Sequence, residues 1–111
     1  MNSETIRDYV LQFDGVTEGF PFGESTLVFK VNEKIFLLMG LDASPLQFNV
    51  KCDPDRAIEL REEYPEHILP GYHMNKKHWN TIIVDGTLPV KLVKEMIGDS
   101  YELVGKKKSK K

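Results

Sequence analysis

The chain has 111 residues, of which 41% are hydrophobic and 29% charged, a composition that suits one soluble domain with a single hydrophobic core. No apolar run approaches the roughly 20 residues that cross a bilayer, and a single cysteine, Cys52, excludes an internal disulfide. The chain does not open on a basic segment followed by an apolar stretch, so no secretory signal is evident. We therefore expect a monomeric cytoplasmic protein with no membrane partner.

The net charge of −2 is unevenly distributed along the chain. Five lysines fall within residues 105–111, so residues 1–104 hold 10 basic against 17 acidic residues and carry a net charge of −7. We predict a single domain over residues 1–104 and a basic, disordered tail over residues 105–111. Such a tail is either solvated or in contact with nucleic acid or an anionic surface.

The N-terminal segment predicts a helix followed by a loop. Ile6, Tyr9, Val10 and Phe13 follow the spacing of one apolar helix face. The stretch "TEGFPFGES", residues 17–25, is rich in glycine and proline and reads as an ordered loop. We expect its two phenylalanines, at positions 20 and 22, to pack over one edge of the core.

Three strands are predicted next, over residues 26–31, 34–41 and 45–51. The first two form a hairpin, and the second is apolar on both faces. The third alternates between apolar and polar residues, so one face of the sheet covers the core and the other faces water or a partner. In the first strand, one face holds Leu27, Phe29 and Val31. In the second, Ile35, Leu37 and Met39 lie on the face opposite Phe36 and Leu38. In the third, the inward face holds Leu46, Phe48 and Val50, and the outward face holds Gln47, Asn49 and Lys51.

The second half of the chain predicts a helix, two strands and a final helix. Asp53-Pro54 starts a helix that Pro65 stops, with residues 57, 60, 61 and 64 on one side. Short strands are predicted over residues 68–74 and 79–85, and the last helix ends at Gly105. The order α-β-β-β-α-β-β-α indicates a two-layer α+β fold, a five-stranded antiparallel sheet with helices on one face.

The sequence carries no established catalytic or metal-binding motif. The three histidines and Cys52 do not fall into CxxC or HExxH spacings, and GxSxG and GxGxxG are absent. We therefore predict no metal, no cofactor and no enzymatic activity. Cys52 precedes a helix start, where a thiol can be activated, but we interpret it as a small buried residue that closes the third strand. A ligand-binding or enzymatic domain using Cys52, His73 and His78 is the third hypothesis on function, after the two given below.

The stretch "PGYHMNKKHWN", residues 70–80, concentrates the side chains most suited to binding. Lys76, Lys77 and His78 can donate hydrogen bonds to an anion, while Tyr72 and Trp79 offer flat surfaces for stacking on bases. The same composition also suits a hairpin whose tryptophan anchors the core while its lysines are solvated. Both interpretations of this segment stay open.

Four segments give the chain a resemblance to a known family. They are "FPFGESTLVFKVNEKIFLLMGL", "LQFNVKCDPDRAIELRE", "PGYHMNKKHWNTI" and "LVKEMIGDSYELV", and their order and spacing resemble the MmcQ/YjbR family of small bacterial proteins. The most specific piece is "PGYHMNKKHW". The resemblance covers residues 6–104 and leaves out the lysine tail.

The resemblance implies an α-β3-α-β2-α fold similar to that of secretion chaperones. It also implies DNA binding through a "double wing" motif. It implies no catalytic residues and no cofactor. It makes a DNA-binding module the first hypothesis on function. The second is a chaperone-like protein-interaction module that binds a partner segment on its sheet. The candidate nucleic-acid-binding residues are Lys30, Lys34, Lys51, Tyr72, His73, Lys76, Lys77, His78 and Trp79.

Overall fold

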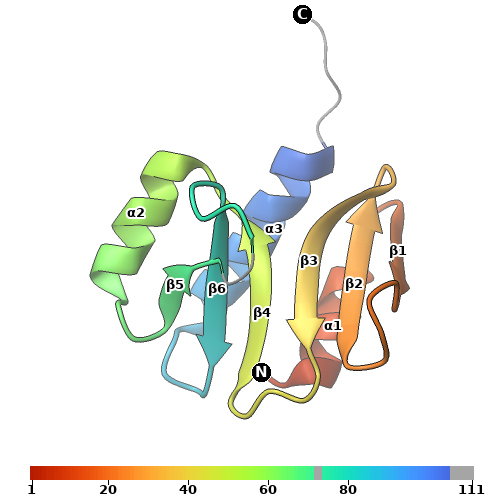
Figure 1. Ribbon diagram of the computed structural model, residues 1–111, viewed down its shortest axis with the longest axis horizontal. Helices are drawn as coiled ribbons and strands as arrows, with labels where there is room; N and C mark the ends of the chain where they lie inside the picture. Colours follow the sequence, from red (N-terminus) through yellow and green to blue (C-terminus); the bar gives the residue numbers. More distant parts are fainter. Residues whose placement is uncertain (72–73, 106–111) are drawn as a thin grey trace, which may run out of the picture.

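The protein is an α+β structure, which a computed structural model describes for residues 1–71 and 74–105. The predicted basic tail beyond Gly105 lies outside the described residues. Three helices and six strands follow one another along the chain (Figure 1). They are α1 (Ser3–Val10), β1 (Val16–Gly19), β2 (Thr26–Val31), β3 (Lys34–Gly40), β4 (Leu46–Lys51), α2 (Pro54–Glu63), β5 (Ile68–Pro70), β6 (Trp79–Val84) and α3 (Val90–Gly105).

All six strands belong to one antiparallel sheet with the order β1-β2-β3-β4-β6-β5. The sequence predicted five strands, and the additional one is β1, which falls partly in the predicted loop. Val16–Gly19 pairs with β2 from Val16↔Val31 to Gly19↔Val28. A four-residue strand ending in glycine shows little alternation of apolar and polar residues, so β1 forms through its pairing with β2. The strand predicted over residues 68–74 is also shorter than expected, because it ends at Pro70.

The β2–β3 hairpin has a two-residue turn and an irregular register. Asn32 and Glu33 both have positive φ, 51° and 67°, as in the mirror-image turns that suit twisted hairpins. The pairing shifts between Phe29↔Leu37 and Lys30↔Ile35, which leaves Phe36 as an extra residue in β3. Strict alternation placed Ile35 on one face with Leu37, and this prediction is wrong, because the bulge turns Phe36 and Leu37 into the core together.

One hydrophobic core lies between the sheet and the helices. Figure 1 shows α1 and α3 behind the sheet, and α2 beside its β5 edge. All three helices contribute to the same buried cluster as the inner sides of β2, β3, β4 and β6. The prediction that Phe48 and Val50 face inward is confirmed. Among the described helices, none is both long and apolar enough to cross a membrane.

A buried serine fixes α3 to the middle of the sheet. Ser100 is fully buried, and its Oγ donates to the carbonyl oxygen of Phe36 at 2.6 Å and accepts from the backbone N–H of Lys51 at 2.9 Å. Tyr101, the next residue, packs edge-on against the Phe36 ring, with centroids 5.5 Å apart. The bulge in β3 and the end of β4 are therefore held by one helix, which sets the position of Lys51.

Candidate nucleic-acid interface

The segment between β5 and β6, which contains most of the "PGYHMNKKHWN" motif, is held by an arginine of α2. The guanidinium of Arg61 donates from Nε to Oδ1 of Asn80 at 2.7 Å, and from Nη2 to the backbone carbonyl oxygens of Lys76 and Trp79, the latter at 3.3 Å. Asn80 is itself buried, with 1% of its surface exposed. Arg61 therefore fixes both the loop and the start of β6.

The glycine of the motif is required by a close approach of two backbones. A Cβ placed on Gly71 would lie 2.7 Å from the Cβ of Trp79, which is closer than carbon atoms pack. The N–H of Gly71 donates to the carbonyl oxygen of Trp79 at 2.8 Å, and the N–H of Cys52 donates to that of His78 at 2.7 Å. The first bond thus joins the two ends of the motif to each other, and the second joins the motif to the residue that follows β4.

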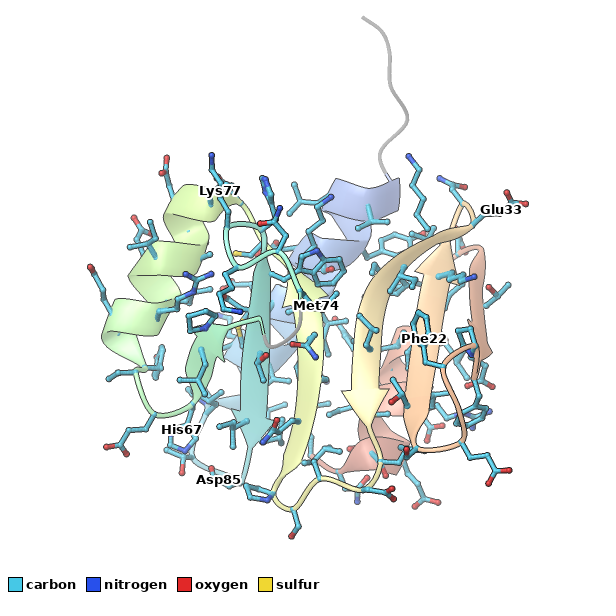
Figure 2. All side chains as sticks on the ribbon, in the orientation of Figure 1. Phe22, Glu33, His67, Met74, Lys77 and Asp85 are labelled. Atoms are coloured by element: carbon cyan, nitrogen blue, oxygen red, sulfur yellow. The ribbon has the colours of Figure 1, made fainter. Side chains whose placement is uncertain are left out.

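The side chains of this segment differ in exposure. Lys76 and Lys77 are exposed, whereas His78 and Trp79 are half-buried. The Nζ of Lys76 lies 3.5 Å from the carbonyl oxygen of Gly71, and Figure 2 shows Lys77 at the tip of the loop. The predicted site residues Tyr72 and His73 lie outside the described residues.

The face of the sheet opposite the helices, here called the open face, brings several predicted residues together. Lys51 and Trp79 are Cα partners across β4 and β6, and Lys30 pairs with Thr17 and Ile35 on the same face. The register assigns to the open face Thr17, Gly19, Thr26, Val28, Lys30, Ile35, Leu38, Gly40, Gln47, Asn49, Lys51, Leu69, Trp79, Thr81 and Ile83.

Lys34 does not join Lys30 and Lys51. It pairs with Val31, whose side chain is buried on the helix side, so Lys34 starts β3 on that side and is exposed at the end of the hairpin. Five predicted residues with positive or potentially positive side chains nevertheless lie near one end of the sheet, where β2 and β4 finish and β6 begins. They are Lys30, Lys51, Lys76, Lys77 and His78.

Acidic side chains are absent from the strand positions of the open face. Glu18 is the single acid within a strand of the described residues, and it lies on the helix side, where its two carboxylate oxygens accept from Arg7 at 2.7 and 2.5 Å. The hydrogen bond with Arg7 lowers the pKa of Glu18. Nine of the 17 acids of the chain lie in the helices: Glu4, Asp8, Asp55, Glu59, Glu62, Glu63, Glu95, Asp99 and Glu102. The helices also hold five basic residues, so they carry a net charge of −4, compared with −7 for residues 1–104 as a whole.

The lysines of the candidate site are not paired with carboxylates. The ion pairs within residues 1–71 and 74–105 use Arg7, Arg56 and His67. In that part of the chain, Lys30, Lys34, Lys51, Lys76 and Lys77 form none. Their ammonium groups are therefore available for an external anion.

Cys52 has the environment of a structural residue. It is buried, and desolvation raises the pKa of its thiol to about 11, with Asp99 and Asp53 adding to the rise. A nucleophilic cysteine requires the opposite shift. The interpretation of Cys52 as a small buried residue that closes β4 is confirmed.

His67 and Asp85 lie far from the lysines. His67 Nε2 lies 2.9 Å from Oδ2 of Asp85, and this hydrogen bond, with those from Thr87, lowers the pKa of Asp85 to about 2. Figure 2 shows this pair at the opposite end of the sheet from Lys77. Within the described ranges, no three His, Cys, Asp or Glu side chains are grouped so that they could hold a metal ion.

Sequence reasoning missed three residues of this region. The inward position of Arg61 on α2 was visible in the sequence, but its partners in the loop were not. Phe20 and Phe22 were expected to pack over the core, and this prediction is wrong, because they are 49% and 64% exposed. Figure 2 shows Phe22 in front of β2, over the open face.

Comparison with known proteins agrees with this architecture. A family model described as YjbR matches residues 11–103. The uncharacterized protein YbdF of Escherichia coli O157:H7 is 37% identical over 101 residues, which cover 91% of this chain and 82% of YbdF. The uncharacterized protein YyaQ of Bacillus subtilis (strain 168) is 42% identical over 55 residues, 50% of this chain and 45% of YyaQ.

Two solved structures share the fold. The crystal structure of Deinococcus radiodurans protein DR2400, described as a DUF419 domain, has a TM-score of 0.91 and 41% identity, and covers 97% of this chain and 81% of its own. A protein from Pseudomonas syringae has a TM-score of 0.77 and 26% identity, and covers 94% and 99% of the two chains. The family model spans the sheet, α2, most of α3 and the "PGYHMNKKHW" motif, and the chain belongs to the YjbR family.

Proposed function

We propose that this protein is a non-enzymatic, DNA-binding module that meets phosphates with the open face and the adjoining "PGYHMNKKHWN" loop. The observation that carries the proposal is the segregation of charge. The described strand positions of the open face hold Lys30 and Lys51 and no acid, while the three helices hold nine acidic against five basic residues. A local positive surface can act despite a negative body, because physiological salt screens charges over roughly 8 Å.

The fixed geometry of residues 76–79 supports the same proposal. Arg61 hydrogen-bonds the backbone at Lys76 and Trp79, so the exposed lysines 76 and 77 sit on an ordered segment. Trp79 lies opposite Lys51 in the sheet. A cationic loop that is already ordered loses less conformational entropy on binding an anionic strand than a flexible one.

A chaperone-like module that binds a partner segment on the outer face of the sheet, or at a strand edge, is the competing function. The edge strands are β1, with four residues, and β5, with three residues ending in Pro70. Such short edges present few free backbone groups for strand addition. A partner recovered from a lysate that stays bound after nuclease treatment would favour this second function.

The proposal is tested by removing the positive charges of the open face. We expect the double variant Lys30→Gln/Lys51→Gln to bind a labelled oligonucleotide more weakly. The slope of log K against log salt between about 50 and 200 mM should fall by roughly 1.4 for a single strand or 1.8 for a duplex, because two phosphate contacts are lost. Fluorescence anisotropy measures both quantities.

The matched control is Lys91→Gln/Lys94→Gln, which removes the same charge from exposed positions of α3. Its melting temperature is measured as well, because Lys94 Nζ lies 5.1 Å from the centre of the Tyr9 ring. The control should bind like the wild type. Equal losses in the two double variants would contradict a specific surface, and no binding by the wild type at low salt and micromolar protein would refute the proposal.

A further inference from the structure

The loop between β1 and β2 forms a hollow on the open face that the proposed function does not require. The hollow has a volume of about 400 Å³ and is lined by residues 17–21 together with Val28 and Lys30. Val28 is 1% exposed, so it forms a buried apolar floor, while Phe20 is 49% exposed. Lys30 and Phe20 therefore line the same hollow, and Phe20 also lines a second hollow beside α1, together with Arg7.

This combination suits an unpaired nucleobase next to its phosphate. A base stacks on an aromatic ring whatever its identity, and a nearby cation neutralises the phosphate. The acid in the lining, Glu18, is already bound by Arg7 through two hydrogen bonds and does not stand as a free negative charge. Phe22, from the same loop, is 64% exposed and offers a second ring over β2.

The other side of the open face repeats the arrangement. Lys51 lies beside Trp79 on β4 and β6, and the β2 and β4 positions of Lys30 and Lys51 are two strand spacings apart, roughly 10 Å. Ile35 and Leu38 of β3 lie between them on the same face. An extended strand of nucleic acid could cross from Lys30 and its hollow to Lys51 and Trp79 over an apolar surface.

The elements that could enter the groove of a duplex are poorly suited to it. The major groove admits an α-helix or a two-stranded ribbon. The helices carry most of the acids, and α2 alone has four of them. The β2–β3 hairpin has Glu33 at its tip, where Figure 2 shows its side chain pointing away from the body. A carboxylate at this position would be repelled by the phosphates that line a groove.

We infer that the nucleic acid bound by the open face is single-stranded, with one unpaired base in the hollow formed by residues 17–21, Val28 and Lys30. This inference depends on the proposed function and names its substrate class. The bases are held by stacking and the backbone by Lys30 and Lys51, so recognition is tolerant of sequence. DNA and RNA strands share this chemistry.

The test compares single strands with a duplex for three variants. The probes are labelled oligothymidylate, oligouridylate and a duplex of the same length. Wild-type protein should bind at least one of the single strands about tenfold or more tighter than the duplex. Phe20→Ala should weaken single-strand binding roughly 5- to 100-fold, the range for loss of one stacked base, and leave duplex binding unchanged.

A second variant fills the hollow without changing charge. A Cβ on Gly19 would meet no atom within 4 Å, and Gly19 pairs with Val28 on the open face, so Gly19→Val adds bulk to the hollow without a clash at the Cβ. It should weaken single-strand binding, and valine is favoured in strands. Ile58→Ala, at an exposed apolar residue of α2, is the control and should change nothing.

The outcomes separate the inference from the function on which it depends. Duplex binding as tight as single-strand binding overturns the inference and leaves the proposed function standing. So does single-strand binding that is unaffected by both Gly19→Val and Phe20→Ala. If the wild type binds none of the three probes, both are refuted.

Discussion

At the scale of single residues, Arg61 does more than a sequence pattern suggests. It lies on the inward side of α2 and bonds the side chain of Asn80 and two backbone carbonyls of the motif loop. Arg61 bonds Oδ1 of Asn80, whereas the side-chain nitrogen Nδ2 of Asn80 has no hydrogen-bond partner within residues 1–71 and 74–105. Loss of the guanidinium would therefore leave buried polar groups unsatisfied.

We expect Arg61→Met to lower the free energy of unfolding by about 2 kcal/mol, because charged hydrogen bonds to partly buried groups are lost. Urea denaturation followed by circular dichroism measures the change as a shift of the midpoint at constant slope. The matched control is Arg56→Met, at another arginine of α2. It removes exposed ion pairs to Glu59 and Glu95 and should change stability by less than about 0.5 kcal/mol. Equal effects in both variants would contradict a clamping role for Arg61.

At the scale of elements, prediction succeeded where a segment has its own pattern. The strands over residues 26–31, 34–41, 45–51 and 79–85 were predicted to within one residue at each end, because alternation and β-branched residues are local signals. β1 was missed because "VTEG" becomes a strand through its partner β2. The bulge at Phe36 was missed because it serves contacts with Ser100 and Tyr101, more than 60 residues away.

The candidate site was predictable in composition and only partly in geometry. The register brings Lys30 and Lys51 to the open face and places Lys34 on the other side, because Lys34 pairs with Val31 across the two-residue turn. The hydrogen bonds of Arg61 and the exposure of Phe20 and Phe22 depend on the tertiary structure, which no local sequence pattern encodes. Local sequence therefore identified the "PGYHMNKKHWN" loop, while the tertiary fold determines which of its neighbours can act with it.

The junction of β5, its loop and β6 gives a prediction at the same scale. Gly71→Ala should destabilise the protein by about 1–3 kcal/mol, because the added methyl group would overlap the Cβ of Trp79 and the two backbones must separate. Trp79 is the only tryptophan of the chain, so its fluorescence emission should shift as well. Gly98→Ala is the control: its Cβ meets nothing within 4 Å in the helix α3, where alanine stabilises by roughly 0.5–1 kcal/mol. A stable Gly71→Ala variant with unchanged emission would contradict the close-approach argument.

At the scale of the whole molecule, charge is divided between the two layers and the C-terminal end. Gly105 ends α3 against the β2–β3 hairpin: its carbonyl oxygen accepts from Nδ2 of Asn32 at 2.9 Å, and a Cβ on it would lie 3.3 Å from the methyl groups of Val31. Lys30 and Lys34 flank this turn in sequence. Gly105, which precedes five lysines in the sequence, therefore lies at the end of the sheet where the candidate lysines lie.

We expect the lysine tail to increase the affinity for nucleic acid without favouring a single strand over a duplex. Replacing its five lysines by glutamine takes the net charge from −2 to −7 and should weaken binding to single strand and to duplex by similar factors, because backbone phosphates are common to both. For a single strand the slope of log K against log salt should fall by up to roughly 3.5, the value for five phosphate contacts. Anisotropy titrations at several salt concentrations measure it. A slope equal to that of the wild type would show that the open face and its loop bind nucleic acid without the tail, and a larger loss for one probe would mean that the tail contributes to the choice between strand types.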